Sequence, residues 1–142
     1  PHSGGSTRPC LCKEVYPSVI RMYTWNVRSL LGYANRLAVI ESLKATKGNV
    51  PLIALQETRL REAVQGEPLG DHILYSSPAL GGIGGVGFLV RSDVKVQSWA
   101  PVSNRIAHIT LDCGKTIVVC YAPTEVAPQG QKEVFWDALE EV

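Results

Sequence analysis

The amino-acid sequence predicts an α/β protein, built on a mixed β-sheet with helices packed on one face. Three features predict this class: an opening strand–helix–strand unit, a run of short segments rich in β-branched residues, and a final amphipathic segment. The 142 residues, with 45% hydrophobic and 19% charged side chains, suit one globular domain or a piece of a larger one. This composition excludes collagen-like, coiled-coil and wholly disordered chains.

The amino-terminal part of the sequence predicts an arm followed by the strand–helix–strand unit. Residues 1–18 mix Gly, Ser and Pro without periodicity, so we expect a flexible arm there. β-branched and aromatic residues predict a strand over 19–25, and apolar residues spaced near 3.6 predict a helix over 34–43 that is closed by Lys47-Gly48. The continuous apolar run at 52–55 is typical of a strand buried on both faces of a parallel sheet.

The second half of the sequence contains short strand-like segments and one more amphipathic segment. The Cys113-Gly114 step suits a tight hairpin turn, and Pro123 ends the strand that follows it. Phe135 and Leu139 share one face of a predicted helix over 131–142. After a polar loop, the predicted strands are 72–76, 86–91, 94–99, 105–112 and 115–121.

Charge is distributed unevenly along the chain, although the net charge is only +1. Residues 1–61 carry nine Lys and Arg against three Asp and Glu, a net charge of +6. Residues 62–142 carry five against ten, a net charge of −5. The basic part is therefore the part that we expect to face phosphate.

Cysteine usage and hydropathy indicate the cellular compartment in which the protein is expected. No apolar run approaches the roughly 20 residues that span a bilayer, so we expect no membrane partner. No charged-then-apolar leader is visible, which favours a nuclear or cytoplasmic protein that is not secreted. The cysteine spacings do not match a structural zinc site; the four residues are Cys10, Cys12, Cys113 and Cys120.

A glycine cluster at 81–87 contains a literal G-x-G-x-x-G that begins at Gly82. A dinucleotide-binding fingerprint needs a helix directly after it, but the strand-like run at 88–90 follows here. The cluster is therefore interpreted as a flexible loop that connects strands. The motifs of nucleophile-elbow hydrolases and zincins are absent from the sequence.

Polar side chains follow three predicted strands at their carboxyl ends. Asn26 and Glu57 lie just past the ends of the first two strands, and Tyr121 ends a third. Such side chains converge on one crevice in an α/β sheet, where a carboxylate beside an amide suits Mg²⁺ and a phenol can hold a phosphate oxygen. The alternatives are solvated loop residues for Asn26 and Glu57 and a core-capping aromatic for Tyr121. Packed or solvated roles are expected for the histidines, so no general base is visible; these residues are His2, His72 and His108.

Five blocks together resemble, in order, the first half of the endonuclease/exonuclease/phosphatase superfamily. Their wording is most similar to the endonuclease domain of non-LTR (LINE-type) retrotransposons, and the resemblance covers about residues 19–142. The blocks are TWNVRSL at 24–30, LIALQETRL at 52–60, GGVGFLV at 84–90, NRIAHITL at 104–111 and VVCYAPTE at 118–125.

The resemblance implies a four-layer α/β sandwich that hydrolyses phosphodiester bonds with Mg²⁺, or with Mn²⁺ as the alternative ion. Glu57 in QET resembles the family's metal-binding glutamate, and Asn26 in TWN the asparagine that supports the metal and the carboxylates. Tyr121 in YAP resembles the tyrosine that hydrogen-bonds the scissile phosphate. Arg105 in NRI matches an arginine near the same edge. Catalytic roles for Asn26, Glu57 and Tyr121 are therefore expected.

Two arginines follow the first two motifs directly. Arg28 and Arg59 are placed to neutralise phosphates without reading sequence, the alternative being ordinary solvated arginines. Apurinic nucleases usually carry an acidic residue where Arg28 stands and Asn where Thr124 stands, which argues against that repair specificity.

The family's second half supplies a G-D-x-N motif and a terminal S-D-H motif, and neither occurs in this chain. We therefore expect 19–142 to be a partial domain that lacks its general base and is inactive alone. The partners implied are DNA, the rest of the endonuclease domain and a reverse transcriptase in the full-length protein. Two alternatives stay open: a catalytically dead fragment that binds nucleic acid or a partner, and a related phosphoesterase that acts on lipid or small-molecule phosphates.

Overall fold

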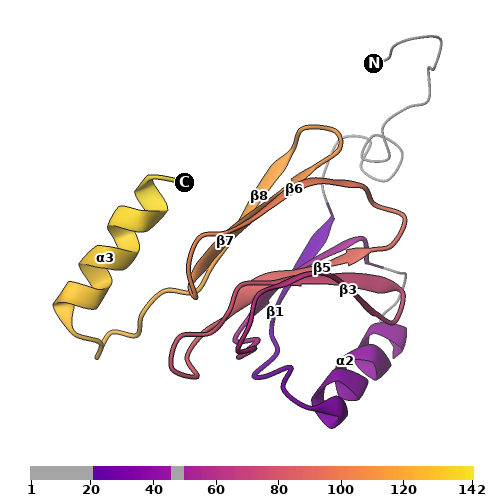
Figure 1. Cartoon of the computed structure of the whole chain (residues 1–142), viewed down its shortest axis with the longest axis horizontal. Helices are drawn as coiled ribbons and strands as arrows, with labels where there is room; N and C mark the ends of the chain where they lie inside the picture. The colour runs from indigo at the N-terminus through magenta and orange to yellow at the C-terminus, as the bar shows by residue number, and fades with distance from the viewer. Residues whose placement is uncertain (1–20, 46–49) are drawn as a thin grey trace.

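The computed structural model describes residues 21–45 and 50–142 (Figure 1). The expected arm at 1–18 and the helix end predicted at Lys47-Gly48 lie outside the described residues. The strands are β1 (Met22–Asn26), β2 (Leu52–Gln56), β3 (Val64–Leu69), β4 (His72–Ser76), β5 (Val86–Arg91), β6 (Val96–Pro101), β7 (Ile106–Leu111) and β8 (Thr116–Cys120), and the helices are α2 (Tyr33–Ala45) and α3 (Gln129–Glu140).

The described strands form two sheets. One has five strands in the order β1-β2-β5-β4-β3, and the other has three in the order β6-β7-β8. β1 and β2 are parallel, as the crossover through α2 requires, and β5 pairs with β2 in the antiparallel direction. The predicted α/β class with a mixed sheet is therefore confirmed.

The core lies in two layers on either side of β2 and β5. Alternate residues of these strands point to opposite faces, so Ala54 and Phe88 face the three-stranded sheet, whereas Leu55 and Leu89 face α2. Both strands are buried almost throughout because a layer covers each face. This explains why the run at 52–55 is continuously apolar instead of alternating.

Three features of the fold differ from the expectation drawn from the pattern. β3 was expected as a loop, because it contains Gly66 and Pro68, which disfavour strands. It forms at the edge of its sheet, where a proline is tolerated, and it carries a register shift between Gln65 and Glu67. The later strands build a separate sheet rather than extending the first one.

The placement of the helices is the third difference. α2 packs on the outer face of the five-stranded sheet, as expected, and contributes the buried Val39 to the core there. α3 lies away from α2, on the side of the three-stranded sheet (Figure 1). The two helices do not share one face because the second sheet already covers the inner face of the first.

The β7–β8 hairpin forms where the sequence predicts it. Its turn places Gly114 at a φ of +92°, a conformation that glycine adopts without a steric penalty. The Gly114 N–H donates to the Leu111 carbonyl at 2.8 Å and closes the turn. Among the described residues, no helix is both long and apolar enough to cross a membrane.

Candidate active site

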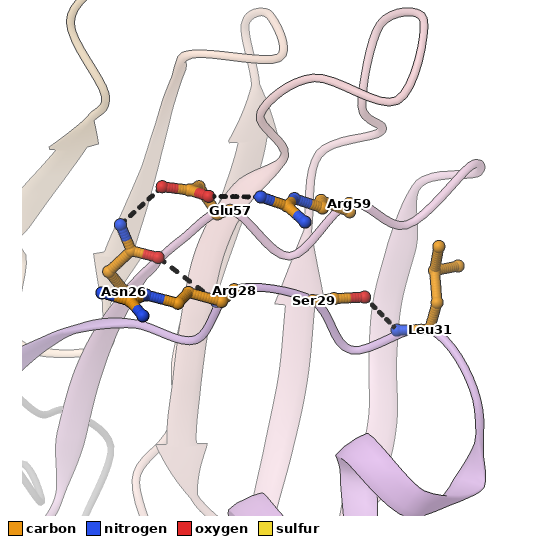
Figure 2. A network of polar contacts seen from close by, with 6 residues as sticks. All are labelled: Asn26, Arg28, Ser29, Leu31, Glu57 and Arg59. Atoms are coloured by element: carbon orange, nitrogen blue, oxygen red, sulfur yellow. Dashed lines mark hydrogen bonds and ion pairs between the residues drawn. The ribbon is translucent and has the colours of Figure 1, made fainter.

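The two sheets bring three of the predicted site residues together at one edge. Asn26 is the last residue of β1, and Glu57 directly follows β2 in the neighbouring position. The Asn26 Nδ2 donates to the Glu57 Oε2 at 2.6 Å (Figure 2). Tyr121 directly follows β8 in the other sheet, and its hydroxyl lies near enough to the Glu57 carboxylate for each group to shift the pKa of the other. The convergence expected from the strand ends is therefore present across both sheets.

The backbone around this edge is held in unusual conformations. Four non-glycine residues in the described ranges have positive φ, and all of them lie in the two loops after β1 and β2; they are Arg28, Ser29, Glu57 and Arg59. Such conformations persist only where surrounding contacts enforce them, and they cluster at functional sites. In the first loop, the Asn26 Oδ1 accepts a bond from the Arg28 N–H at 3.2 Å, and the Ser29 Oγ accepts one from the Leu31 N–H at 3.0 Å (Figure 2).

Hydrogen bonds keep the Glu57 carboxyl ionised. The bond from the Asn26 amide is the largest cause that lowers the pKa of Glu57 below its ordinary 4.5, with smaller contributions from Arg59 and Tyr121. Partial burial opposes this shift. Glu57 therefore presents a carboxylate at neutral pH.

Tyr121 has the opposite shift. Burial raises the pKa of Tyr121 above its ordinary 10.0, and the negative charge of Glu57 raises it further. A tyrosine in this state keeps its proton at neutral pH and can donate a hydrogen bond to an anionic oxygen.

The arginines at this edge have different surroundings. The Arg59 Nη2 pairs with the Glu57 Oε1 at 2.8 Å while its side chain remains 44% exposed. The Arg105 Nη1 donates to the Tyr121 carbonyl at 3.1 Å, and its guanidinium lies 5.3 Å from the centre of the Tyr121 ring. Arg28 is exposed and joins the site through its backbone. Arg59 and Arg105 thus contact site residues directly.

The two histidines in the described ranges lie elsewhere. His72 begins β4 opposite Arg91, at the end of the strand away from the site, and its Nε2 lies 2.8 Å from the Val50 carbonyl oxygen. His108 lies in the middle of β7, paired with Val118. His2 is outside the described residues.

The donor set at this edge is small. Glu57 offers a carboxylate and Asn26 an amide oxygen. In the part of the chain that the structure describes, no three or more His, Cys, Asp or Glu side chains are grouped so that they could hold a metal ion. Mg²⁺ commonly keeps several waters and binds through one or two carboxylates together with substrate phosphates. The oxygens of Glu57 and Asn26 are thus of the kind that Mg²⁺ prefers, and these two residues are the ones at this edge that could hold such an ion.

Sequence reasoning missed a buried hydroxyl cluster beneath the site. Thr58, Ser76 and Ser77 are fully buried, and the Thr58 Oγ1 lies 2.8 Å from the Ser76 Oγ. The one signal in the sequence was the position of Thr58 inside the QET block. A polar residue in a loop is normally expected in solvent, so the pattern alone gives no reason to bury it.

The glycine cluster borders the same site. β5 begins inside it, at Val86, so the strand expected after the glycines is present where the fingerprint would need a helix. Its outer part is a short turn in which Leu80 and Ile83 exchange backbone hydrogen bonds of 2.9 and 3.0 Å. Its inner part bonds to the loop that carries Glu57, because the Thr58 N–H donates to the Gly85 carbonyl at 3.0 Å.

The described fold is similar to part of two solved structures, each under 25% identical to this chain. It resembles the catalytic domain of Xenopus laevis APE2, with a TM-score of 0.59, 18% identity, and coverage of 84% of this chain and 52% of that one. It also resembles the 3'-5' exonuclease NExo from Neisseria meningitidis, with a TM-score of 0.60, 23% identity, and coverage of 85% and 50%. This chain thus spans about half the length of each structure. No protein-family model and no curated protein matches the sequence.

Removing the Asn26 amide should raise the pKa of Glu57 towards 4.5, because the Asn26 bond is the largest cause that lowers it. A carboxyl with a lowered pKa stabilises the fold above its unfolded pKa, and this stabilisation is lost as the pH falls through the folded value. Asn26→Ala should therefore reduce the loss of folding stability that Glu57 causes as the pH falls below 4.5. A carboxyl-carbon NMR titration measures the shift, with Asn35→Ala on α2 as the control, and an unchanged Glu57 pKa would contradict the prediction.

Proposed function

We propose that this chain is the amino-terminal half of a Mg²⁺-dependent DNA endonuclease of the non-LTR (LINE-type) retrotransposon kind. The observation that carries the proposal is the contact of Asn26, Glu57 and Tyr121 at one edge, where strands of both sheets end. The nuclease-like fold supports hydrolysis of phosphodiester bonds. The TWNVRSL, QETRL and YAPT blocks support the retrotransposon type.

The proposal requires a second half of the domain. The chain covers 50 to 52% of the two solved structures that it resembles, which is consistent with a partial domain over 19–142. We place the G-D-x-N and S-D-H motifs, and with them the general base, in that second half. The full-length protein, meaning this chain joined to the half with both motifs, is the form in which activity is expected, and a reverse transcriptase is its proposed further partner in the nucleus or cytoplasm.

Glu57 and Asn26 are the residues that would hold the metal ion. When bound there, Mg²⁺ or Mn²⁺ supplies Lewis-acid catalysis by polarising a phosphoryl oxygen and stabilising charge on the leaving oxygen. The lowered pKa of Glu57 favours cation binding, since the carboxyl does not have to lose a proton at neutral pH.

The other residues at this edge act on the substrate and on Glu57. Asn26 donates to one carboxylate oxygen and fixes its orientation. The Tyr121 hydroxyl, protonated at neutral pH, donates to an oxygen of the scissile phosphate, and Arg105 holds the tyrosine through its carbonyl and ring face. Arg28 and Arg59 contact neighbouring phosphates; a substrate phosphate at Arg59 competes with its ion pair to Glu57.

Arg28→Ala in the full-length protein should weaken DNA binding and reduce the slope of log K against log salt by about 1, as expected for the loss of one phosphate contact. The exposed side chain of Arg28 makes this contact available. Arg21→Ala is the matched control, because Arg21 is an exposed arginine just before β1, at the opposite end of the strand from Asn26. Fluorescence anisotropy over a salt series measures both slopes. Equal slopes for the two variants would show that Arg28 does not contact the DNA.

Substrate class is tested with the full-length protein on three substrates. We expect nicking of supercoiled plasmid that needs Mg²⁺ and stops with EDTA, and no turnover of inositol phosphates or phospholipid headgroups. Salt-sensitive DNA binding without cleavage would instead identify a catalytically dead binding protein. Turnover of lipid or small-molecule phosphates alone would identify a related phosphoesterase.

A further inference from the structure

The turn after β2 carries the key carboxylate in an unfavourable backbone conformation. Glu57 and Arg59 have φ values of +57° and +56°, in the left-handed region that non-glycine residues seldom adopt. Thr58, between them, is fully buried, although both neighbours reach the surface of the site. Contacts made by Thr58 must therefore hold the turn in place.

The Thr58 side chain is bonded within a buried hydroxyl pair. The Ser76 hydroxyl donates to the Ser77 carbonyl at 2.9 Å, which uses its one proton. The Thr58 Oγ1 lies 2.8 Å from the Ser76 Oγ, so the Thr58 hydroxyl is the donor in that pair. Both residues are fully buried, so water cannot replace the Thr58 donor if it is removed. The Ser76 oxygen would then accept no hydrogen bond, which is costly for a buried group.

The Thr58 backbone is bonded in two further directions. Its N–H donates to the Gly85 carbonyl at 3.0 Å, and its carbonyl accepts from the Leu30 N–H at 2.8 Å. The next residue continues the pattern, since the Arg59 N–H donates to the Gly84 carbonyl at 2.9 Å. Thr58 thus joins the loop after β1, the end of β4 and the glycine cluster.

Gly85 allows the close approach that these bonds need. A Cβ at this position would lie 2.3 Å from the Thr58 Oγ1 and 3.0 Å from the Arg59 N, and its φ is +85°. Only glycine leaves room there without displacing Thr58. The inner part of the glycine cluster is therefore packed against the turn, in place of the flexible loop expected from the sequence.

We propose that Thr58, Ser76 and Gly85 are positioning residues that set the placement of Glu57, and through it the rate of the reaction. The proposal rests on the proposed function for its catalytic consequence, but the positioning itself is a property of the folded chain. None of the three contacts the substrate edge directly, because Thr58 and Ser76 are fully buried and Gly85 has no side chain.

Thr58→Val removes the hydroxyl and keeps the branched shape, so it tests the proposal directly. We expect amide hydrogen exchange at Arg59, measured by NMR on the 142-residue chain, to accelerate about tenfold or more, because its bond to Gly84 depends on the same turn. In the full-length protein we expect kcat for plasmid nicking to fall about 10- to 100-fold with KM unchanged. Thr58→Ser, which restores the hydroxyl, should recover most of both losses.

Thr110→Val is the matched control, because Thr110 and Thr116 form another hydroxyl pair at 2.8 Å between β7 and β8. It should leave Arg59 exchange and kcat unchanged. If Thr58→Val does not fold, Ser76→Ala removes the acceptor of the same bond and should give the same changes. Wild-type exchange at Arg59 in a folded variant would overturn the proposal, as would a lower melting temperature with unchanged kcat. Absence of nicking by the wild-type full-length protein would instead count against the proposed function, while the exchange result would still decide the positioning role.

Discussion

Glu57→Gln in the full-length protein is expected to lower the rate of Mg²⁺-dependent plasmid nicking by roughly 100- to 1,000-fold, the range seen when one preorganised electrostatic group is removed from an active site. The substitution keeps the size of the side chain but removes the charge. Among the described residues at this edge, Glu57 supplies the carboxylate, and its hydrogen bond from Asn26 keeps it ionised. A neutral amide has much weaker affinity for a hard divalent cation than a carboxylate has.

Glu62→Gln is the control for this substitution. Glu62 is an exposed carboxylate five residues further along the same loop, so the variant changes the net charge by the same amount. It should nick plasmid at the wild-type rate. Initial rates at several Mg²⁺ concentrations separate weaker metal binding from a slower chemical step, and nicking by Glu57→Gln at the wild-type rate would show that Glu57 is not the metal ligand.

Gly87→Ala is expected to lower the free energy of unfolding by about 3 kcal/mol, the upper part of the usual range for forcing atoms into a packed core. Gly87 lies in the central strand β5, paired with Leu55 on one side and Ser76 on the other. A Cβ there would lie 1.9 Å from the Tyr75 carbonyl oxygen and 2.7 Å from the Ser76 Cα. Both are backbone atoms of β4, so the β4–β5 pairing must open to make room.

Gly130→Ala is the control for the glycine substitution. Gly130 lies in the first turn of α3, and a Cβ there would meet no atom within 4 Å. It should leave stability unchanged or raise it by up to about 1 kcal/mol, since alanine favours helix. Urea unfolding followed by circular dichroism measures both variants. Equal unfolding midpoints for Gly87→Ala and the wild-type chain would contradict the close β4–β5 contact.

The sequence predicts those strands whose burial leaves a clear pattern. Apart from their last residues, β2 and β5 carry no polar side chains, because layers cover both of their faces, and the β7–β8 turn is marked by Gly114. β3 is hidden because Gly66 and Pro68 suit loops as well as an irregular edge strand. The division into two sheets is not encoded in any local pattern, since an alternating strand pairs equally well in either sheet.

In the candidate site too, the sequence predicts the residues whose positions follow from a local pattern and misses those that depend on distant contacts. Asn26, Glu57 and Tyr121 were found because each directly follows or ends a strand, and the edge of a sheet gathers such positions. Thr58 and Ser76 were missed because their burial results from the approach of the glycine cluster, which only the three-dimensional structure contains. Their contribution depends on contacts between segments distant in sequence.

The most direct test of the central claim, that Glu57 and Asn26 hold the catalytic ion, is a crystal structure of the full-length protein with Mn²⁺ in place of Mg²⁺, located by anomalous scattering. Mn²⁺ accepts the same oxygen ligands as Mg²⁺. We expect an ion bound to a Glu57 carboxylate oxygen and to the Asn26 amide oxygen, at roughly the 2.0–2.2 Å expected for such ligands, with Tyr121 beside it. An ion bound elsewhere, with Glu57 still bonded only to Asn26 and Arg59, would contradict this claim.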